Sequence, residues 1–195
     1  MNKVLFSLLM TAAFLVCIGG SVHMNCAAEE AAPLSGAKKI LVAYFSHTGN
    51  TRQIAEHIHA IAGGDLFEIQ AVDPYPADYH AVLEKARQEL ESRYKPALKT
   101  TIENIGSYDV LFVGYPIWFG TYPAPVKTFL SEYDLSGKTI VPFSTHGGGG
   151  PGRSASDVSK LCPRSTVLEG FSIPGNSAKT ARDTVAEWLK KIRMT

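Results

Sequence analysis

Runs of apolar residues alternate with amphipathic segments along most of the chain. Residues 40–45 form a continuous apolar run, which is typical of a parallel strand covered on both faces. The next segment, residues 51–62, places Ile54 and Ile58 on one helical face and ends at a Gly-Gly pair. Spacing of this kind indicates an amphipathic helix. The pattern therefore predicts a buried strand followed directly by a helix.

The same alternation continues to the C-terminus. Further strands are predicted at 65–71, 110–114, 139–144 and 166–169, and further helices at 79–91, 124–133, 154–161 and 178–192. Strands that alternate with helices pair in parallel through right-handed crossovers. Five such units predict an α/β fold, a three-layer sandwich with a five-stranded parallel sheet between two layers of helices. Ligands of such sheets bind at the carboxyl ends of the strands.

The first residues have a different pattern. Lys3 is followed by an almost wholly apolar run, residues 4–18, and then by small residues that lead to Ala28. A positive charge, an apolar run and small residues, in this order, are typical of a secretory signal peptide. We therefore expect an exported protein, periplasmic or extracellular, that is cleaved after Ala28. A retained N-terminal anchor is the alternative.

The chain is accordingly divided into a signal peptide (1–28), a flexible lead-in (29–38) and one domain (39–195). A lipid-anchored form is a second alternative, but neither Cys17 nor Cys26 is preceded by the small residue that lipoprotein processing needs. Once the leader is removed, we expect no segment that spans a membrane, because no other apolar run is long enough.

Composition fits a single well-cored domain. The chain has 195 residues, of which 45% are hydrophobic and 19% charged, enough for independent folding. Without residues 1–28 the acidic and basic side chains are equal in number, so there is no electrostatic case for a nucleic-acid partner. Cys162 would then be the only cysteine. We expect it to be a buried structural thiol.

A polar loop follows the first predicted strand. It consists of Ser46, His47, Thr48, Gly49, Asn50 and Thr51, and it leads directly into a helix. Such a loop turns backbone N–H groups inward, and the helix dipole adds partial positive charge, so the loop predicts a phosphate site. It matches neither a Walker A loop nor the glycine pattern of dinucleotide folds. The alternative is an ordinary helix start capped by Asn50 or Thr51.

Two more strand-end loops have unusual compositions. The loop after the third strand gathers aromatic residues, and it contains Pro116, Ile117, Trp118, Phe119 and Gly120, followed by Tyr122. The loop after the fourth strand is glycine-rich and contains Thr145, His146, Gly147, Gly148 and Gly149. Glycines lose much conformational entropy on folding, so a run of them is a poor choice for a passive loop.

Segments 44–51, 113–120 and 144–149 together resemble the flavodoxin family, and the similarity extends over the chain from Lys39. The resemblance implies the flavodoxin fold, with strand order 2-1-3-4-5, and FMN as cofactor. In that setting the first loop binds the phosphate, the aromatic loop walls the isoalloxazine, and the glycine loop lies against its polar edge.

Individual roles follow from the resemblance. Trp118 is the leading stacking residue, with Phe119 and Tyr122 behind it, and the alternative is that Trp118 plugs a hydrophobic rim. His146 either donates to the reduced flavin or caps a strand end. Tyr75 and Tyr79 resemble a recurring segment of exported relatives, where packing is favoured over a place at the ring edge. The acids Glu84, Glu89 and Glu91 are interpreted as a solvated helix face.

The resemblance and the three loops favour an electron carrier that exchanges electrons with redox partner proteins or small acceptors. We predict no catalytic residue and no metal site, because no dyad or ligand cluster is visible. One alternative is an FMN-dependent NAD(P)H:quinone-type oxidoreductase, and another is a flavin-free binding domain on the same fold. The neutral charge argues against steering of partners by a negative face. The oligomeric state is left open by the sequence.

Overall fold

The computed structural model describes residues 38–195. The predicted signal peptide, nearly all of the lead-in, and both Cys17 and Cys26 lie outside the described residues. In chain order the elements are β1 (Ile40–Tyr44), α1 (Asn50–Ala62), β2 (Asp65–Glu68), α2 (Tyr79–Glu91), η1 (Ile105–Ser107), β3 (Val110–Pro116), α3 (Ala124–Glu132), β4 (Thr139–His146), α4 (Ser154–Leu161), β5 (Thr166–Val167), β6 (Phe171–Pro174), η2 (Gly175–Thr180) and α5 (Arg182–Lys191).

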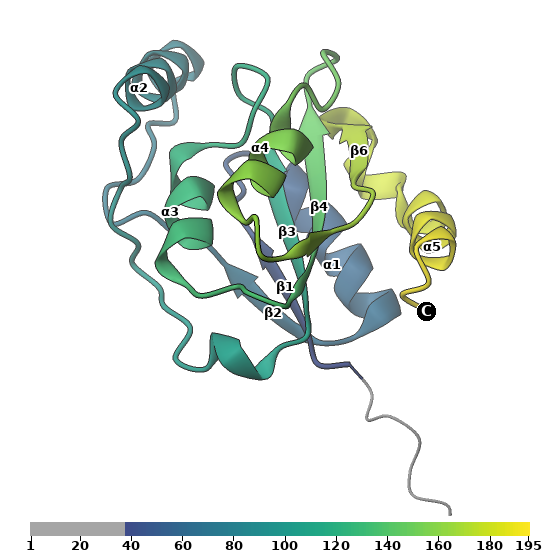
Figure 1. Cartoon of the computed structure of the whole chain (residues 1–195). Coiled ribbons are helices and arrows are strands. Elements are labelled where there is room, and N and C mark those ends of the chain that lie inside the picture. Colours follow the sequence, from purple (N-terminus) through teal and green to yellow (C-terminus); the bar gives the residue numbers. More distant parts are fainter. Residues whose placement is uncertain (1–37) are drawn as a thin grey trace, which may run out of the picture. The chain divides into compact units, whose positions relative to one another are not determined.

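The strands form one parallel sheet of order β2-β1-β3-β4-β5. This confirms the flavodoxin-like α/β sandwich that was predicted, and Figure 1 shows helices on both sides of the sheet. The two faces separate the strand residues by alternation. In β1, Val42 and Tyr44 face the layer of α1 and α5, whereas Leu41 and Ala43 face the layer of α3 and α4.

The fifth strand position is occupied by two short strands. β5 pairs with the start of β4, and β6, which was not predicted, pairs with its second half in parallel. The break lies opposite Pro142 of β4, which has no N–H to donate to a neighbouring strand. Gly170 passes so close that a Cβ there would lie 2.8 Å from the Pro142 carbonyl oxygen. A continuous edge strand is therefore excluded at this point.

Two predicted boundaries are wrong by three residues or more. β2 ends at Glu68 instead of continuing to residue 71, because residues 70–72 bond to another segment: the N–H of Lys99 donates to Gln70 at 2.8 Å. The closing helix begins at Arg182 and not at residue 178. The residues before it form η2, and the Ala178 carbonyl lies 3.2 Å from His57 Nε2 of α1.

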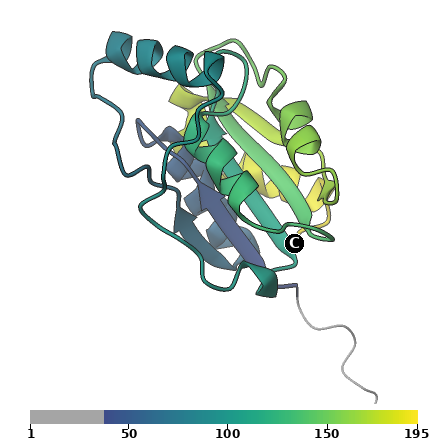
Figure 2. The ribbon, with the colours of Figure 1, turned by 60° about the vertical axis from the view of Figure 1, so that its left-hand side comes forward.

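Helix α2 lies at the same end of the sheet as the loops after β3 and β4 (Figures 1 and 2). Asp78 caps it by accepting a bond from the Ala81 N–H at 2.9 Å. The interpretation of its acids as one solvated face is wrong for Glu89, which is 7% exposed. Glu89 lies on the same helical face as Val82 and Ala86, so the fold buries it with them.

Cys162 is buried in the core of the α3 and α4 layer, and burial raises the pKa of its thiol. The prediction of a structural thiol is confirmed. Between residues 38 and 195, no helix has the length and apolar character needed to cross a membrane.

Candidate functional site

The loop between β1 and α1 leaves the start of the helix without a side-chain cap. Gly49 is the N-cap residue, with φ of 89°, so the cap position supplies no side-chain hydrogen bond. The alternative in which Asn50 or Thr51 caps the helix is therefore wrong. Ser46 Oγ accepts only the Arg52 N–H, at 3.3 Å. A left-handed conformation at this position favours glycine over any residue with a Cβ.

The backbone amides of this loop are available to a ligand. Within residues 38–195, no acceptor is found for the N–H groups of Thr48, Gly49, Asn50 and Thr51. These four free donors lie at the start of α1, where the helix dipole places its partial positive charge, and such a helix start binds anions. Gly49 and Asn50 are half-buried and Thr48 is exposed, so a bound anion stays in reach of solvent.

The predicted phosphate loop (residues 46–51) and the glycine loop (residues 145–149) are joined by one buried contact. The hydroxyls of Thr51 and Thr145 lie 2.9 Å apart, and both residues are at most 3% exposed. Beyond Thr145 the backbone of Gly147, Gly148 and Gly149 faces open space, because a Cβ on any of them would meet nothing within 4 Å. A flat ring can therefore approach this backbone closely.

His146 orders the glycine loop from within. Its Nδ1 accepts the Gly148 N–H at 3.0 Å, so the neutral ring carries its proton on Nε2. The side chain is half-buried, and Gly148 adopts φ of 119°. His146 thus holds the loop in shape and retains one N–H donor on the opposite side of its ring.

The aromatic loop after β3 is a tight reversal. Trp118 and Thr121 exchange two backbone bonds, of 2.9 and 3.0 Å, around Phe119 and Gly120. Both central residues have positive φ, 49° and 75°, which is the backbone pattern of a type I′ turn. For a bulky residue such as Phe119 this conformation is rare and strained. Its side chain is 40% exposed.

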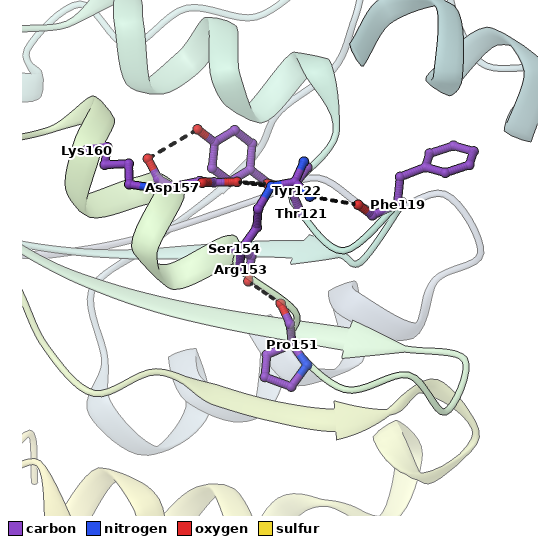
Figure 3. A network of polar contacts seen from close by, with 8 residues as sticks. All are labelled: Phe119, Thr121, Tyr122, Pro151, Arg153, Ser154, Asp157 and Lys160. Atoms are coloured by element: carbon purple, nitrogen blue, oxygen red, sulfur yellow. Dashed lines mark hydrogen bonds and ion pairs between the residues drawn. The ribbon is translucent and has the colours of Figure 1, made fainter. Parts of the chain in front are cut away.

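The turn is held against the N-terminus of α4 (Figure 3). Thr121 Oγ1 donates to the Asp157 carboxylate at 2.7 Å, and Arg153 Nε donates to the same oxygen at 3.0 Å. The Arg153 N–H also donates to the Gly120 carbonyl at 2.8 Å. On the sheet side, the Ile117 N–H donates to the Thr145 carbonyl at 2.8 Å. These bonds position the turn relative to the glycine loop.

Trp118 is the centre of an aromatic cluster. The rings of Phe45, His47 and Tyr75 contact it edge-on, with centroid distances of 5.7, 6.0 and 4.9 Å. His47 belongs to the phosphate loop, so this cluster joins that loop to the aromatic loop. Tyr122 instead points toward α4 and packs against Tyr115 at 5.7 Å.

The three loops therefore meet at one end of the sheet, with Pro116 and Ile117 half-buried beneath them. The packing expected of Tyr75 is confirmed, whereas Tyr79 is 69% exposed and packs little. The assignment of individual residues to a cofactor remains a prediction.

A buried pair beside Trp118 was missed by the sequence reasoning. The Tyr75 hydroxyl donates to the Glu89 carboxylate, and burial raises the pKa of both groups. The signal for it was present, because Glu89 lies three residues after Ala86 on the apolar face of α2. The structure thus places a titratable carboxyl group next to the aromatic cluster.

The arrangement suits one class of ligand. Uncapped amides at a helix N-terminus fit a phosphate, an aromatic loop and a bare glycine backbone fit a flat ring, and the two subsites are one hydrogen bond apart at Thr51 and Thr145. The free amides and the open space at Gly147–Gly149 suit the phosphate and the flat ring of a phosphorylated flavin.

Comparison with solved structures gives close counterparts. A candidate flavoprotein from Bacteroides eggerthii is 39% identical, with a TM-score of 0.71, over 80% of this chain and 98% of that one. A candidate flavoprotein from Bacteroides uniformis is 32% identical, also with a TM-score of 0.71, over 79% and 99% of the two chains. A Lactobacillus acidophilus flavoprotein in complex with FMN shares the fold, with 22% identity, a TM-score of 0.63, and coverage of 77% and 99%.

Among curated proteins, the uncharacterized NAD(P)H oxidoreductase YcaK of Escherichia coli is 25% identical over 90 residues. That match covers 44% of this chain and 46% of the relative, so the chain spans about half the length of the curated relative it matches. The family model described as Flavodoxin matches residues 39–192, nearly the whole of the described domain. The chain therefore belongs to the flavodoxin family.

Proposed function

We propose that this protein binds FMN and acts in electron transfer. The observation that carries the proposal is the uncapped start of α1, whose free amides adjoin the glycine loop through the bond between Thr51 and Thr145. Family membership and the fold shared with the FMN complex from Lactobacillus acidophilus support it. Bound FMN supplies one-electron and two-electron redox chemistry.

The chain's own residues have distinct roles in this proposal. The amides of residues 48–51 and the hydroxyls of Ser46 and Thr48 hold the phosphate. Trp118 and Phe119 provide an apolar wall and keep water from the ring. The N–H groups of the glycine loop, shaped by His146, contact the polar edge of the ring and so adjust how easily it accepts charge.

The test uses two glycines with the same backbone constraint at opposite ends of the domain. Gly49 and Gly137 have φ of 89° and 73°, and at both a Cβ would meet nothing within 4 Å. Gly49→Ala and Gly137→Ala should each lower the free energy of unfolding by about 1–2 kcal/mol through left-handed strain. Only Gly49→Ala should also weaken FMN binding, measured by quenching of flavin fluorescence.

Equal FMN affinity in the two variants would contradict a phosphate site at the start of α1. Wild-type protein that stays colourless and takes up no added FMN would overturn the proposal as a whole.

An FMN-dependent NAD(P)H reductase is the second candidate, and the buried Tyr75–Glu89 pair favours it. Glu89 is a carboxyl group beside the aromatic cluster whose pKa burial raises, and one-electron transfer needs no such acid or base. The name of the Escherichia coli relative points the same way. Anaerobic titration separates the candidates: rapid bleaching of bound flavin by stoichiometric NADH or NADPH supports the reductase. Slow or absent bleaching supports the carrier.

We further propose that the protein is exported, with residues 1–28 as its signal peptide. Support comes from the charge, apolar run and small residues at the start of the sequence. N-terminal sequencing of protein recovered from the periplasm or the medium should begin at Glu29. Protein that remains in the cytoplasm with an intact N-terminus would contradict export.

A further inference from the structure

A cavity of about 730 Å³ lies between α2, α3 and α4, beside the loop after β3. Its volume falls within the range of small-molecule sites. It shares Trp118 and Phe119 with the candidate flavin loops, but no residue of the phosphate loop or of the glycine run 147–149 lines it. The cavity is therefore a separate space on the far side of the aromatic turn.

One wall of the cavity is a polar network (Figure 3). The Asp157 carboxylate pairs with Arg153 at 3.0 Å and with Lys160 at 3.8 Å, and it also accepts the Thr121 hydroxyl. Both cations of this wall therefore share one acid. Cations without any acid partner among the described residues lie elsewhere in the cavity.

Two cations without an acid partner in the described domain lie at the junction of α2 and α3. Arg93 and Lys127 line the cavity there, and Lys127 Nζ donates to the Arg93 carbonyl at 2.9 Å. Within residues 38–195, neither of these side chains nor that of nearby Lys95 forms an ion pair. The pKa of Lys127 is lowered by burial first, and then by the positive charges of Lys95 and Arg93.

The remaining lining is largely apolar and aromatic. Leu90 contributes from α2, Tyr94 from the segment just after it, Tyr122 from the loop after β3, and Leu161 from α4. Leu90, Tyr94 and Phe119 are exposed hydrophobic residues, at 38%, 53% and 40%.

Glu89 also lines the cavity, but its carboxylate accepts the Tyr75 hydroxyl and forms no ion pair with the two cations at the junction of α2 and α3. Apolar and aromatic area together with two cations that have no ion-pair partner within residues 38–195 complements a flat molecule that carries a single acid group.

We propose that this cavity binds an aromatic carboxylate of about two fused rings. The rings contact Leu90, Phe119 and Tyr122, and the carboxylate accepts bonds from Lys127 and Arg93. A guanidinium and an ammonium that face one carboxylate relieve their mutual repulsion, and they form charge-assisted hydrogen bonds out of bulk water. The site does not depend on FMN, because the two share only the aromatic turn.

The test is isothermal titration calorimetry of the full-length purified protein with 2-naphthoate, and with its neutral analogue 2-naphthamide. We expect one naphthoate per chain, with affinity at least about tenfold above that of the amide, because a charge-assisted bond adds more than a neutral one. Binding should be the same with and without excess FMN.

Charge-removing variants locate the acid group. Arg93→Gln and Lys127→Gln should each weaken naphthoate binding by about tenfold, the loss expected for one charge-assisted bond, and they should leave 2-naphthamide binding unchanged. Lys190→Gln, an exposed position on α5, is the matched control and should change neither. Circular dichroism checks that each variant is folded. If a variant is unfolded, the comparison of 2-naphthoate and 2-naphthamide binding to the wild-type protein still tests the proposal.

Three results would overturn the proposal. Equal or absent binding of the acid and the amide would exclude a carboxylate site. Displacement of naphthoate by FMN would place the probe in the flavin site instead. A dimer in sedimentation velocity that Leu90→Glu dissociates, and that does not bind naphthoate, would assign the cavity to a second copy of the chain. Absence of FMN binding would leave the cavity proposal intact, so the two proposals fail separately.

Discussion

The two tryptophans of this chain lie in regions with different physical tasks. Trp188 of α5 is 7% exposed and packs against Phe112 and Phe171 at centroid distances of 5.9 and 5.1 Å. Its indole N–H donates to the Glu169 carbonyl at 3.3 Å. Every side of the ring meets the α1 and α5 core, so its burial serves stability.

Trp118 is also surrounded by rings, but it stands on a strand-end loop and is half-buried. Its neighbours Phe45, His47 and Tyr75 come from other segments, and one of them belongs to the phosphate loop. The same side chain thus fills a core on a helix face in one region and joins separate loops at a strand end in the other. The roles of Trp188 and Trp118 are distinguished by their burial and not by residue type, since both are tryptophan.

The largest expected effect is on stability in the α5 region. Trp188→Ala should lower the free energy of unfolding by about 3–5 kcal/mol, because a large buried ring is replaced by a cavity. Urea denaturation followed by circular dichroism measures it, with Trp188→Phe as the control that retains an aromatic ring. FMN affinity of the folded fraction should be unchanged. A loss in the free energy of unfolding below about 1 kcal/mol, well under the range for such truncations, would remove the contrast between Trp188 and Trp118.

Trp118→Ala should affect FMN binding more than stability, which is the reverse of the effect of Trp188→Ala. We expect FMN affinity to fall about tenfold, the loss of roughly 1 kcal/mol or more of aromatic stacking, with a much smaller loss of stability than at Trp188. Flavin fluorescence titration gives the affinity, and Trp118→Phe should retain most of it. Unchanged FMN affinity together with marked destabilisation would show that Trp118 only packs at a hydrophobic rim and does not stack on the flavin.

The strained turn at Phe119 lies next to Trp118, so its stability extends the comparison between the Trp118 and Trp188 regions. Phe119 holds φ of 49°, so Phe119→Asn should raise the free energy of unfolding by about 1 kcal/mol, because Asn tolerates left-handed backbone. Phe119→Leu keeps the strain and should give no gain. Thermal denaturation of both variants is the measurement. A gain in both would mean that exposure of the ring, and not backbone strain, is what destabilises the turn.

The smallest effect concerns pH. Burial raises the pKa of Glu89 above its ordinary 4.5, so the folded state favours the protonated acid. The stability that this contributes is complete below pH 4.5 and is lost as pH rises through the folded pKa. Relative to Glu89→Gln, the wild-type free energy of unfolding should therefore fall between acid and neutral pH.

Denaturation at several pH values measures this difference. Glu84→Gln, which removes the same charge from an exposed position on α2, is the matched control. A wild-type curve parallel to that of Glu89→Gln at all pH values would show that folding does not raise the pKa of Glu89.

Much of the fold was predictable because it depends on local periodicity. Continuous apolar runs identified β1, β3 and β4, and helical spacing gave α2 and α4 with their observed bounds. The split at the fifth position was not predictable. It depends on Gly170 passing against Pro142, a contact between residues 28 positions apart in the sequence that no local pattern records.

The sequence by itself determined the order of strands and helices and which three loops follow strands. These depend on residue type and spacing within a few turns of chain. Only the tertiary structure decided that α1 begins uncapped, that Thr51 meets Thr145, and that Glu89 is buried against Tyr75. The physical reason is that a side chain's burial and its hydrogen-bond partner are set by elements far apart in sequence, and at a strand-end site those contacts carry the chemistry.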